Sequence, residues 1–240
     1  MVESGGCRVL IDCGFSAKEL EKRLALIDVD PNTIDAVVVT HEHADHFKGV
    51  ATTASRYGLD VWMSHGTWLG SGAREHGKLH LFHADQGAFC IGDMEMLPFT
   101  VPHDAREPCQ YLCSVGKVTL GILTDAGAVT GHIVEALSTA DALVLECNHD
   151  ETMLANGPYP PRLKARVGGI YGHLSNRQAA QLLAGLDASR LQHLAAAHLS
   201  EKNNHPEKAK ATLLEASPDM EDRLTLFDQH QVGNWMEVLA

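Results

Sequence analysis

The sequence predicts a layered α/β fold. Short apolar runs of strand length alternate along the chain with stretches in which apolar residues recur at helical spacing. The chain has 240 residues, of which 45% are hydrophobic and 21% charged, so it can bury a substantial core and is neither disordered nor fibrous. Polar side chains directly follow several apolar runs, at the strand ends where such sheets place their sites. We expect a single domain over residues 1–240, with two smaller domains as the alternative.

The N-terminal part is expected to contain three strands and two helices. Ser16 has the side chain of a helix N-cap, and the apolar residues after it recur every three or four positions. The run Ala36-Val37-Val38-Val39 is apolar throughout, which is typical of a strand buried on both faces. The expected elements are strands at 9–11, 36–39 and 61–63, a helix after Ser16, and a helix from about 48 to 57.

The middle of the chain, residues 79–123, contains short β-like runs separated by Gly92-Asp93 and Gly116-Lys117 turns, so we expect an antiparallel stretch there. After it the alternation of helix and strand returns, and Ser175 is placed to cap a helix. The elements expected in this part are helices at 131–137, 176–186 and 206–216 and strands at 142–146 and 191–197.

Composition restricts the location and the partners. No apolar run approaches the roughly 18 residues of a membrane-spanning helix, and the first six residues lack the features of a secretory signal. We therefore expect a cytoplasmic protein with no membrane partner, whose six cysteines are free thiols. The net charge of −12 argues against a surface that coats nucleic acid generally. A local exception lies at 152–190, which holds one acidic residue, Asp187, and five basic residues: Arg162, Lys164, Arg166, Arg177 and Arg190.

The most informative motif is His41-x-His43-x-Asp45-His46, directly after a buried strand. In an extended segment, residues two apart point the same way, so His41 and His43 can bind one ion together. Asp45 and His46, after the chain turns, can face a second ion. The spacing therefore predicts a two-metal site rather than a histidine-rich surface loop.

A site of this size needs further ligands, and they recur after later strands. His103, Asp125 and His198 each follow an apolar run, where a side chain can reach a shared cleft. We expect His41, His43 and His103 on one ion, Asp45, His46 and His198 on the other, and Asp125 between them. A carboxylate bridge between ions roughly 3.5–4 Å apart leaves room for a bridging hydroxide.

These segments resemble the metallo-β-lactamase fold superfamily in order and spacing: Thr40-His41-Glu42-His43-Ala44-Asp45-His46, Val101-Pro102-His103-Asp104, Leu123-Thr124-Asp125 and Ala197-His198-Leu199-Ser200. Further segments resemble its YycJ/WalJ branch: Leu10-Ile11-Asp12-Cys13-Gly14-Phe15-Ser16, Leu145-Glu146-Cys147-Asn148-His149-Asp150, Asn156-Gly157-Pro158-Tyr159-Pro160 and Gly172-His173-Leu174-Ser175-Asn176. The resemblance implies an αββα sandwich, two divalent metal ions (zinc or manganese) and hydrolysis of phosphodiesters, with DNA exonuclease action as the activity of the branch.

One departure from the family concerns the N-terminus. Family members begin with an additional strand before the segment that corresponds to residues 2–6 here, so we expect an N-terminal strand of the fold to be missing and a sheet edge to be exposed.

The catalytic residues expected from the resemblance are Asp45, Glu146 and His173. The sequence is similar to the tRNA-processing enzyme RNase Z in having a glutamate at a strand end, Glu146, and then His173 ahead of a capped helix. In that comparison the carboxylate orients the histidine, which protonates the leaving oxygen. The alternative is that Glu146 is only a carboxylate at a strand end and His173 only a packing histidine. We assign no role to His149 and Asp150.

The basic stretch of Arg162, Lys164 and Arg166 is interpreted as a clamp for the phosphate backbone of a nucleic-acid substrate, the alternative being a solvated helix face. Three other functions stay open. Thioester hydrolysis of the glyoxalase II kind uses nearly the same ligands and needs no acid for a thiolate. The second is true β-lactamase activity, although those enzymes typically lack the bridging aspartate that Asp125 supplies. The third is a non-enzymatic, metal-bearing scaffold, which would hydrolyse no substrate. The sequence leaves the oligomeric state unknown.

Overall fold

The computed structural model describes residues 1–74 and 77–240. The chain forms two compact units. The first comprises Met1–Thr100 with Ala105–Val115, and the second comprises Val101–Asp104 with Gly116–Ala240. The prediction of one domain over residues 1–240 stays a prediction.

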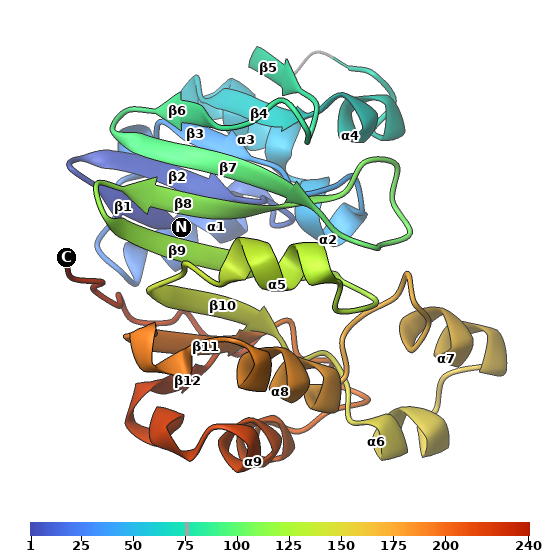
Figure 1. The fold of residues 1–240 in the computed structure, drawn as a ribbon. Coiled ribbons are helices and arrows are strands. Elements are labelled where there is room, and N and C mark those ends of the chain that lie inside the picture. The colour runs from blue at the N-terminus through green and yellow to red at the C-terminus, as the bar shows by residue number, and fades with distance from the viewer. Residues whose placement is uncertain (75–76) are drawn as a thin grey trace. The chain divides into compact units, whose positions relative to one another are not determined.

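The first unit contains a five-stranded sheet of order β1-β2-β3-β4-β5 (Figure 1). β1 pairs antiparallel with β2, and the other pairs are parallel. The strands are β1 (Val2–Ser4), β2 (Cys7–Ile11), β3 (Ala36–Val38), β4 (Asp60–Ser64) and β5 (Lys78–Phe82). The helices are α1 (Ala17–Ala25), α2 (Ala44–Phe47), α3 (Val50–Tyr57) and α4 (His65–Gly70), with a 3-10 turn at Pro31–Thr33.

The predicted strands and the Ser16 cap of the first unit are confirmed. The Ser16 hydroxyl accepts a hydrogen bond from the backbone of Glu19, and Leu20 and Leu24 of α1 join the same buried cluster as Val37 and Val61. The helix expected from about 48 to 57 is confirmed as α3, which begins two residues later, at Val50, and ends at Tyr57.

The middle stretch is antiparallel only in part. β6 (Phe89–Ile91), β7 (Met94–Thr100) and β8 (Cys109–Val115) pair antiparallel, with Gly92 at φ +60° in the β6–β7 turn. The expectation is wrong for β5, which pairs parallel with β4 after the intervening helix α4.

The second unit contains a parallel sheet of order β9-β10-β11-β12. Its strands are β9 (Val118–Leu123), β10 (Ala142–Glu146), β11 (His193–Ala197) and β12 (Leu224–Leu226). The helices are α5 (Gly131–Leu137), α6 (Glu151–Asn156), α7 (Pro161–Val167), α8 (Asn176–Gly185) and α9 (Pro206–Ala216), with 3-10 turns at Ala188–Arg190 and Pro218–Arg223. β9 lies within the stretch expected to be antiparallel, and its pairing with β10 is parallel.

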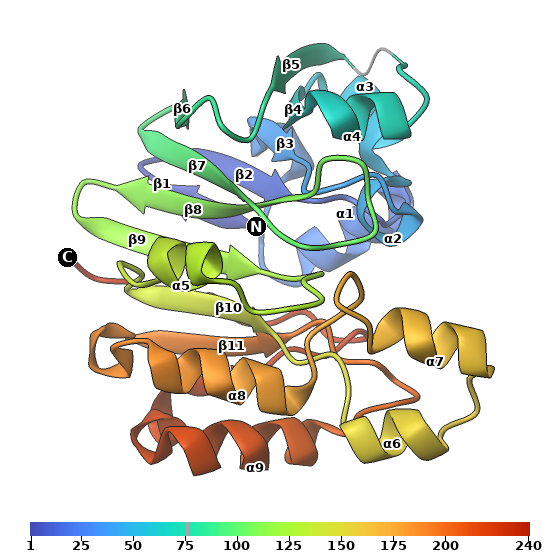
Figure 2. The ribbon, with the colours of Figure 1, turned by 45° about the vertical axis from the view of Figure 1, so that its right-hand side comes forward.

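The later predictions for the second unit hold, with the strand before α9 beginning at His193 rather than at 191. Ser175 caps α8 in a full capping box with Gln178. Figures 1 and 2 show α8 and α9 side by side along the parallel strands, and α6 and α7 together beyond the carboxyl end of β10. The sequence did not predict α6, α7 or β12 as elements.

All six cysteines are free thiols, as expected. Over the described part of the chain, every helix is too short or too polar to cross a lipid bilayer.

A buried hydrogen bond ties β8 to the end of β3 within the first unit, and it generates a stability prediction. The Tyr111 hydroxyl, fully buried, donates to the carbonyl oxygen of Val39 at 2.6 Å. Tyr111→Phe leaves that carbonyl buried without its donor, so we expect the free energy of unfolding to fall by about 1–3 kcal/mol in urea titration. The matched variant Tyr159→Phe, at a half-buried position, should change it by less than about 0.5 kcal/mol. Equal effects would contradict this account of Tyr111.

Candidate active site

The loop after β3 brings the two histidines of the first motif together. His41 is fully buried, and its Nε2 lies 2.9 Å from Nδ1 of His43. Two imidazole nitrogens bound to one tetrahedral ion at 2.0–2.1 Å would be about 3.3 Å apart. These two nitrogens therefore converge at nearly the separation that a shared ion requires.

A buried hydroxyl fixes the tautomer of His41. The Thr40 hydroxyl donates to Oδ2 of Asp12 at 2.7 Å, so its oxygen can accept from Nδ1 of His41, 3.0 Å away. With the proton on Nδ1, the lone pair of His41 is on Nε2, the nitrogen that faces His43.

Asp12 orients His46 in the same unit. It has a left-handed backbone (φ 62°), and its carboxylate also accepts from the backbone N–H of Thr40 at 2.7 Å. Nδ1 of His46 lies 2.7 Å from Oδ2 of Asp12 and donates to it. His46 thus presents Nε2, as a metal-binding histidine held by a carboxylate does.

A close backbone approach holds the turn that carries Asp45. The backbone N–H of Cys13 donates to the carbonyl oxygen of His46 at 2.7 Å. A Cβ on Gly14 would lie 1.7 Å from the carbonyl oxygen of Asp45, so only glycine fits there. Asp45 itself is exposed at the start of α2, with Oδ2 3.6 Å from Nε2 of His46.

In the second unit, Glu146 is the centre of the site. It ends β10 and is fully buried. Its Oε1 accepts from Nδ1 of His173 and from Nδ1 of His198, both at 2.9 Å. Its Oε2 accepts from the backbone N–H groups of Ala126 at 3.1 Å and Leu174 at 3.0 Å. Four donors therefore satisfy this buried carboxylate and fix two imidazoles.

These hydrogen bonds shift the pKa values of Glu146 and His173 in opposite directions. Burial would raise the pKa of Glu146, but the hydrogen bonds from His173 and His198 lower it to about 2. Burial would lower the pKa of His173, but its hydrogen bonds to Asp125 and Glu146 raise it to about 10. At neutral pH the metal-free site thus holds an ionised Glu146 and a protonated His173.

The remaining ligand candidates of this unit lie around the same carboxylate. Asp125 and His198 both have left-handed backbones, with φ of 50° and 57°, a conformation that is rare without glycine and common at functional sites. Oδ1 of Asp125 lies 3.2 Å from Nδ1 of His173 and 3.7 Å from Nε2 of His198. Asp125, Glu146, His173 and His198 each offer a ligand atom within 4.8 Å of the others.

His103 is held in the tautomer that a metal needs. It is almost fully buried, and its Nδ1 donates to the carbonyl oxygen of Gly172 at 2.9 Å. Nε2 therefore carries the lone pair, and it lies 3.8 Å from Oδ1 of Asp125. The donor sets of both units, imidazole nitrogens and carboxylates, are those that zinc and manganese accept.

The basic stretch lies on α7, and two of its side chains have structural partners. Arg166 pairs with the carboxylate of Asp104 at 2.5 and 3.2 Å, and Lys164 donates to the carbonyl oxygen of Ala155 at 2.6 Å. Arg162 is exposed. Of the three side chains of the expected clamp, Arg162 is exposed to solvent, whereas Lys164 and Arg166 also form hydrogen bonds within the protein.

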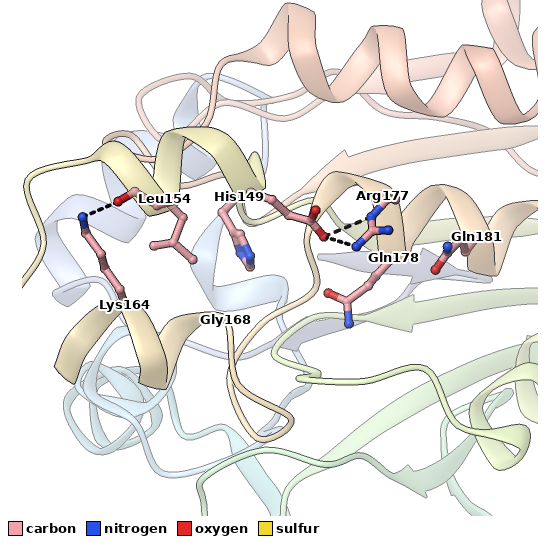
Figure 3. A pocket seen from close by; sticks show the side chains of 9 residues that line it. His149, Leu154, Lys164, Gly168, Arg177, Gln178 and Gln181 are labelled. Carbon is pink, nitrogen blue, oxygen red and sulfur yellow. Dashed lines mark hydrogen bonds and ion pairs between the residues drawn. The ribbon is translucent and has the colours of Figure 1, made fainter. Parts of the chain in front are cut away.

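Lys164 lines a pocket of about 590 Å³ between α6, α7 and α8. Figure 3 shows the ring of His149 in the middle of this pocket, between Leu154 and Arg177. Arg177 forms an ion pair with Glu151, which also lines the pocket. Burial lowers the pKa of His149, which keeps the imidazole neutral at physiological pH.

Sequence reasoning missed Asp12 as a site residue and missed the bond from His198 to Glu146. The signal for Asp12 was a carboxylate at the end of the strand next to β3, which is the same signal that identified the other ligands. Asp104, which anchors Arg166, lies 62 residues away from it and has no local signal.

Comparison with known proteins places this site in context. A family model described as a beta-lactamase superfamily domain matches residues 7–193. The chain is 32% identical over 219 residues to the exodeoxyribonuclease WalJ of Streptococcus pneumoniae, covering 89% of this chain and 81% of that protein. It is 34% identical over 212 residues to the exodeoxyribonuclease YycJ of Bacillus anthracis, covering 86% and 79%. The crystal structure of the metallo-β-lactamase fold protein YhfI from Bacillus subtilis matches with a TM-score of 0.72 at 17% identity, covering 98% and 89%. The predicted fold class is confirmed.

The charge separation at Glu146 predicts a pKa change. In chelator-treated protein, Glu146→Gln removes the charge that favours the imidazolium, so the pKa of His173 should fall from about 10 toward its ordinary value. Folding raises the pKa of His173, so its protonation contributes to the stability of the metal-free fold. This contribution is fully present at pH values below the ordinary pKa of histidine and is lost as the pH rises through about 10. NMR titration of the His173 ring measures the change. The matched variant Glu135→Gln, at an exposed position on α5, should leave the titration unaltered, and an unaltered titration in Glu146→Gln would refute the pairing.

Proposed function

Because this chain belongs to the beta-lactamase superfamily domain family, and within it to a YycJ/WalJ-like branch, we propose that it is a dinuclear-metal-dependent phosphodiesterase that acts on DNA as an exonuclease. The observation that carries the proposal is the fully buried carboxylate of Glu146, whose Oε1 accepts a hydrogen bond from Nδ1 of His173 at 2.9 Å. Hydrolysis of DNA expels an alkoxide, which leaves poorly unless it is protonated.

The metal ligands are proposed from the motifs, from family membership and from the tautomers. His41, His43 and His103 would hold one ion, and Asp45, His46 and His198 the other, with Asp125 as the shared carboxylate. Hydrogen bonds from Nδ1 to Thr40, Asp12, Gly172 and Glu146 support the use of Nε2 in His41, His46, His103 and His198. The ions are zinc or manganese, and when bound they supply Lewis acidity and a nucleophile at neutral pH.

Protonation of the leaving oxygen depends on two side chains of the protein, His173 and Glu146. Nδ1 of His173 stays bonded to Oε1 of Glu146, which leaves the proton on Nε2 for the leaving oxygen of the DNA strand. Glu146 remains ionised throughout, because its four donors stabilise the charge. After the transfer, the neutral imidazole regains a proton from water to restart the cycle. Asp45 would complete the catalytic set by holding the second ion when that ion is bound.

The Glu146–His173 pair also distinguishes this proposal from thioester hydrolysis of the glyoxalase II kind. A thiolate leaves without protonation, so the pair would have no task in that reaction. Asp125 argues against a true β-lactamase, and metal-dependent turnover of any diester would exclude a non-enzymatic scaffold. We place the protein in the cytoplasm, with nucleic acid as its substrate.

The acid role of His173 predicts a dependence on the leaving group. His173→Ala should keep its metal content and lose roughly 10²–10⁴-fold in turnover of DNA. A diester that expels nitrophenolate hardly needs protonation, so its hydrolysis should fall far less. His193→Ala, a half-buried histidine elsewhere in the same unit, serves as the matched control and should lose neither activity. The ratio of the two losses is measured with purified protein in zinc or manganese. Equal losses on both substrates, or loss of metal with His173, would overturn the acid role and return thioester hydrolysis to equal standing.

The ligand assignment predicts about two metal ions per chain, because seven ligands are too many for one tetrahedral ion. Elemental analysis of Asp45→Ala should show loss of one ion, whereas Asp60→Ala, a carboxylate that pairs with Lys78 and His80, should retain both. A single tightly held ion in the native protein, unaltered by added metal, would contradict the dinuclear site.

A further inference from the structure

Two large apolar side chains project from the segment that leads into His173. Ile170 is 67% exposed and Tyr171 is 57% exposed. Across residues 1–74 and 77–240, they are the only consecutive pair of large hydrophobic side chains that are both exposed. Their exposure costs hydrophobic free energy, so it calls for a physical reason.

The backbone of this segment is fixed, so the exposure does not come from a loose loop. The N–H of Gly172 donates to the carbonyl oxygen of Gly169 at 2.8 Å, and the carbonyl oxygen of Tyr171 accepts from the N–H of Asp104 at 3.0 Å. On the other side, a Cβ at Gly127 would lie 2.4 Å from the carbonyl oxygen of Ile170, so the two backbones touch. The backbone that carries the exposed aromatic side chain is thus held in place on both sides.

This backbone lies close to the proposed proton donor. One residue, Gly172, separates Tyr171 from His173, so their Cα atoms are at most about 7 Å apart. The carbonyl oxygen of Gly172, between them, accepts the Nδ1 proton of His103. One short segment therefore orients a proposed metal ligand, carries the proposed acid and displays the pair Ile170–Tyr171.

We infer that Tyr171 is a stacking platform for an unpaired nucleobase of the DNA strand whose phosphodiester is cleaved, with Ile170 packing against its edge. This inference rests on the proposed function. A base presents an apolar face that stacks on an aromatic ring whatever its identity, so this contact would be independent of the DNA sequence. Two side chains are far too few for a protein interface, which needs about 20–30 residues on each side.

Basic side chains on the helix before the segment suit a DNA strand. Of the five basic residues at 152–190, Arg166, Arg177 and Arg190 form ion pairs with Asp104, Glu151 and Asp141, and the other two, Arg162 and Lys164, lie on α7. Arg162, exposed on α7, can meet a backbone phosphate while the base contacts Tyr171. Because a base inside a duplex has both faces covered by its neighbours, the platform favours unpaired bases over internal paired ones.

Steady-state kinetics on a single-stranded oligonucleotide test the platform. Tyr171→Ala should raise KM for the oligonucleotide about 5- to 150-fold, the loss expected for one base–aromatic stack, while kcat changes little. Tyr171→Phe and Tyr171→Trp keep an aromatic face and should stay within about 3-fold of the native protein. Trp235→Ala removes an exposed aromatic side chain from the C-terminal segment and should leave KM unaltered. Arg162→Ala should instead reduce the salt dependence of binding, which Tyr171→Ala should not.

A spectroscopic readout separates stacking from a structural role. An oligonucleotide with 2-aminopurine at its end should lose fluorescence on binding to chelator-treated native protein and to Tyr171→Phe, because the base stacks on the ring. Tyr171→Leu, which keeps an apolar side chain of similar size, should abolish the quench, and this variant decides the matter should Tyr171→Ala fail to fold. Quenching that persists in Tyr171→Leu, or a native KM for single strands in Tyr171→Ala, overturns the platform while DNA hydrolysis stands. Absence of DNA hydrolysis by the native, metal-loaded protein overturns the proposed function itself.

Discussion

The buried carboxylate of Glu146 is the interaction on which the functional side chains of the second unit depend. An ionised carboxylate without partners could not stay in this core, because removing it from water costs several kcal/mol. Four hydrogen bonds compensate for that cost, and they come from both neighbouring parts of the sheet and from the segment before α8. The position at the end of β10 makes this possible, since β9 and β11 flank that strand and end beside it. The same bonds that stabilise the charge also fix the rings of His173 and His198.

The first unit uses the same device on a smaller scale. Asp12 ends β2, accepts two bonds from Thr40 and holds the ring of His46. In both units a carboxylate at a strand end, satisfied by fixed donors, determines which imidazole nitrogen carries the proton. Hydrogen-bond partners of this kind fix the tautomer and the orientation of a histidine ring before any ion is bound. The backbone that carries the exposed pair Ile170–Tyr171 is also fixed, since it is hydrogen-bonded at Tyr171 and Gly172.

Local patterns in the sequence were sufficient for most of the fold. The strand 142–146, the helices 131–137 and 206–216, and the Ser16 and Ser175 caps depend on neighbours in sequence, and the structure matches them. The failures have a non-local cause. The turn residues Gly92-Asp93 and Gly116-Lys117 suggested an antiparallel stretch over 79–123, but α4 provides the crossover that makes β5 parallel to β4. α7 buries none of its residues fully, so no apolar stripe marked it. Asp12 and Asp104 act on residues that are distant in sequence, and pairing across a fold cannot be read from a single chain segment.

We propose that Glu146 keeps His173 in the form that protonates the leaving oxygen. The most direct measurement is kcat/KM for a series of phosphodiesters with leaving groups of graded pKa, compared between the native protein and Glu146→Gln at equal metal content. An effective acid makes the rate nearly independent of leaving-group pKa, so the native protein should show a shallow dependence and the variant a steep one. Parallel dependences in the two proteins would contradict the claim and leave Glu146 with a purely structural role.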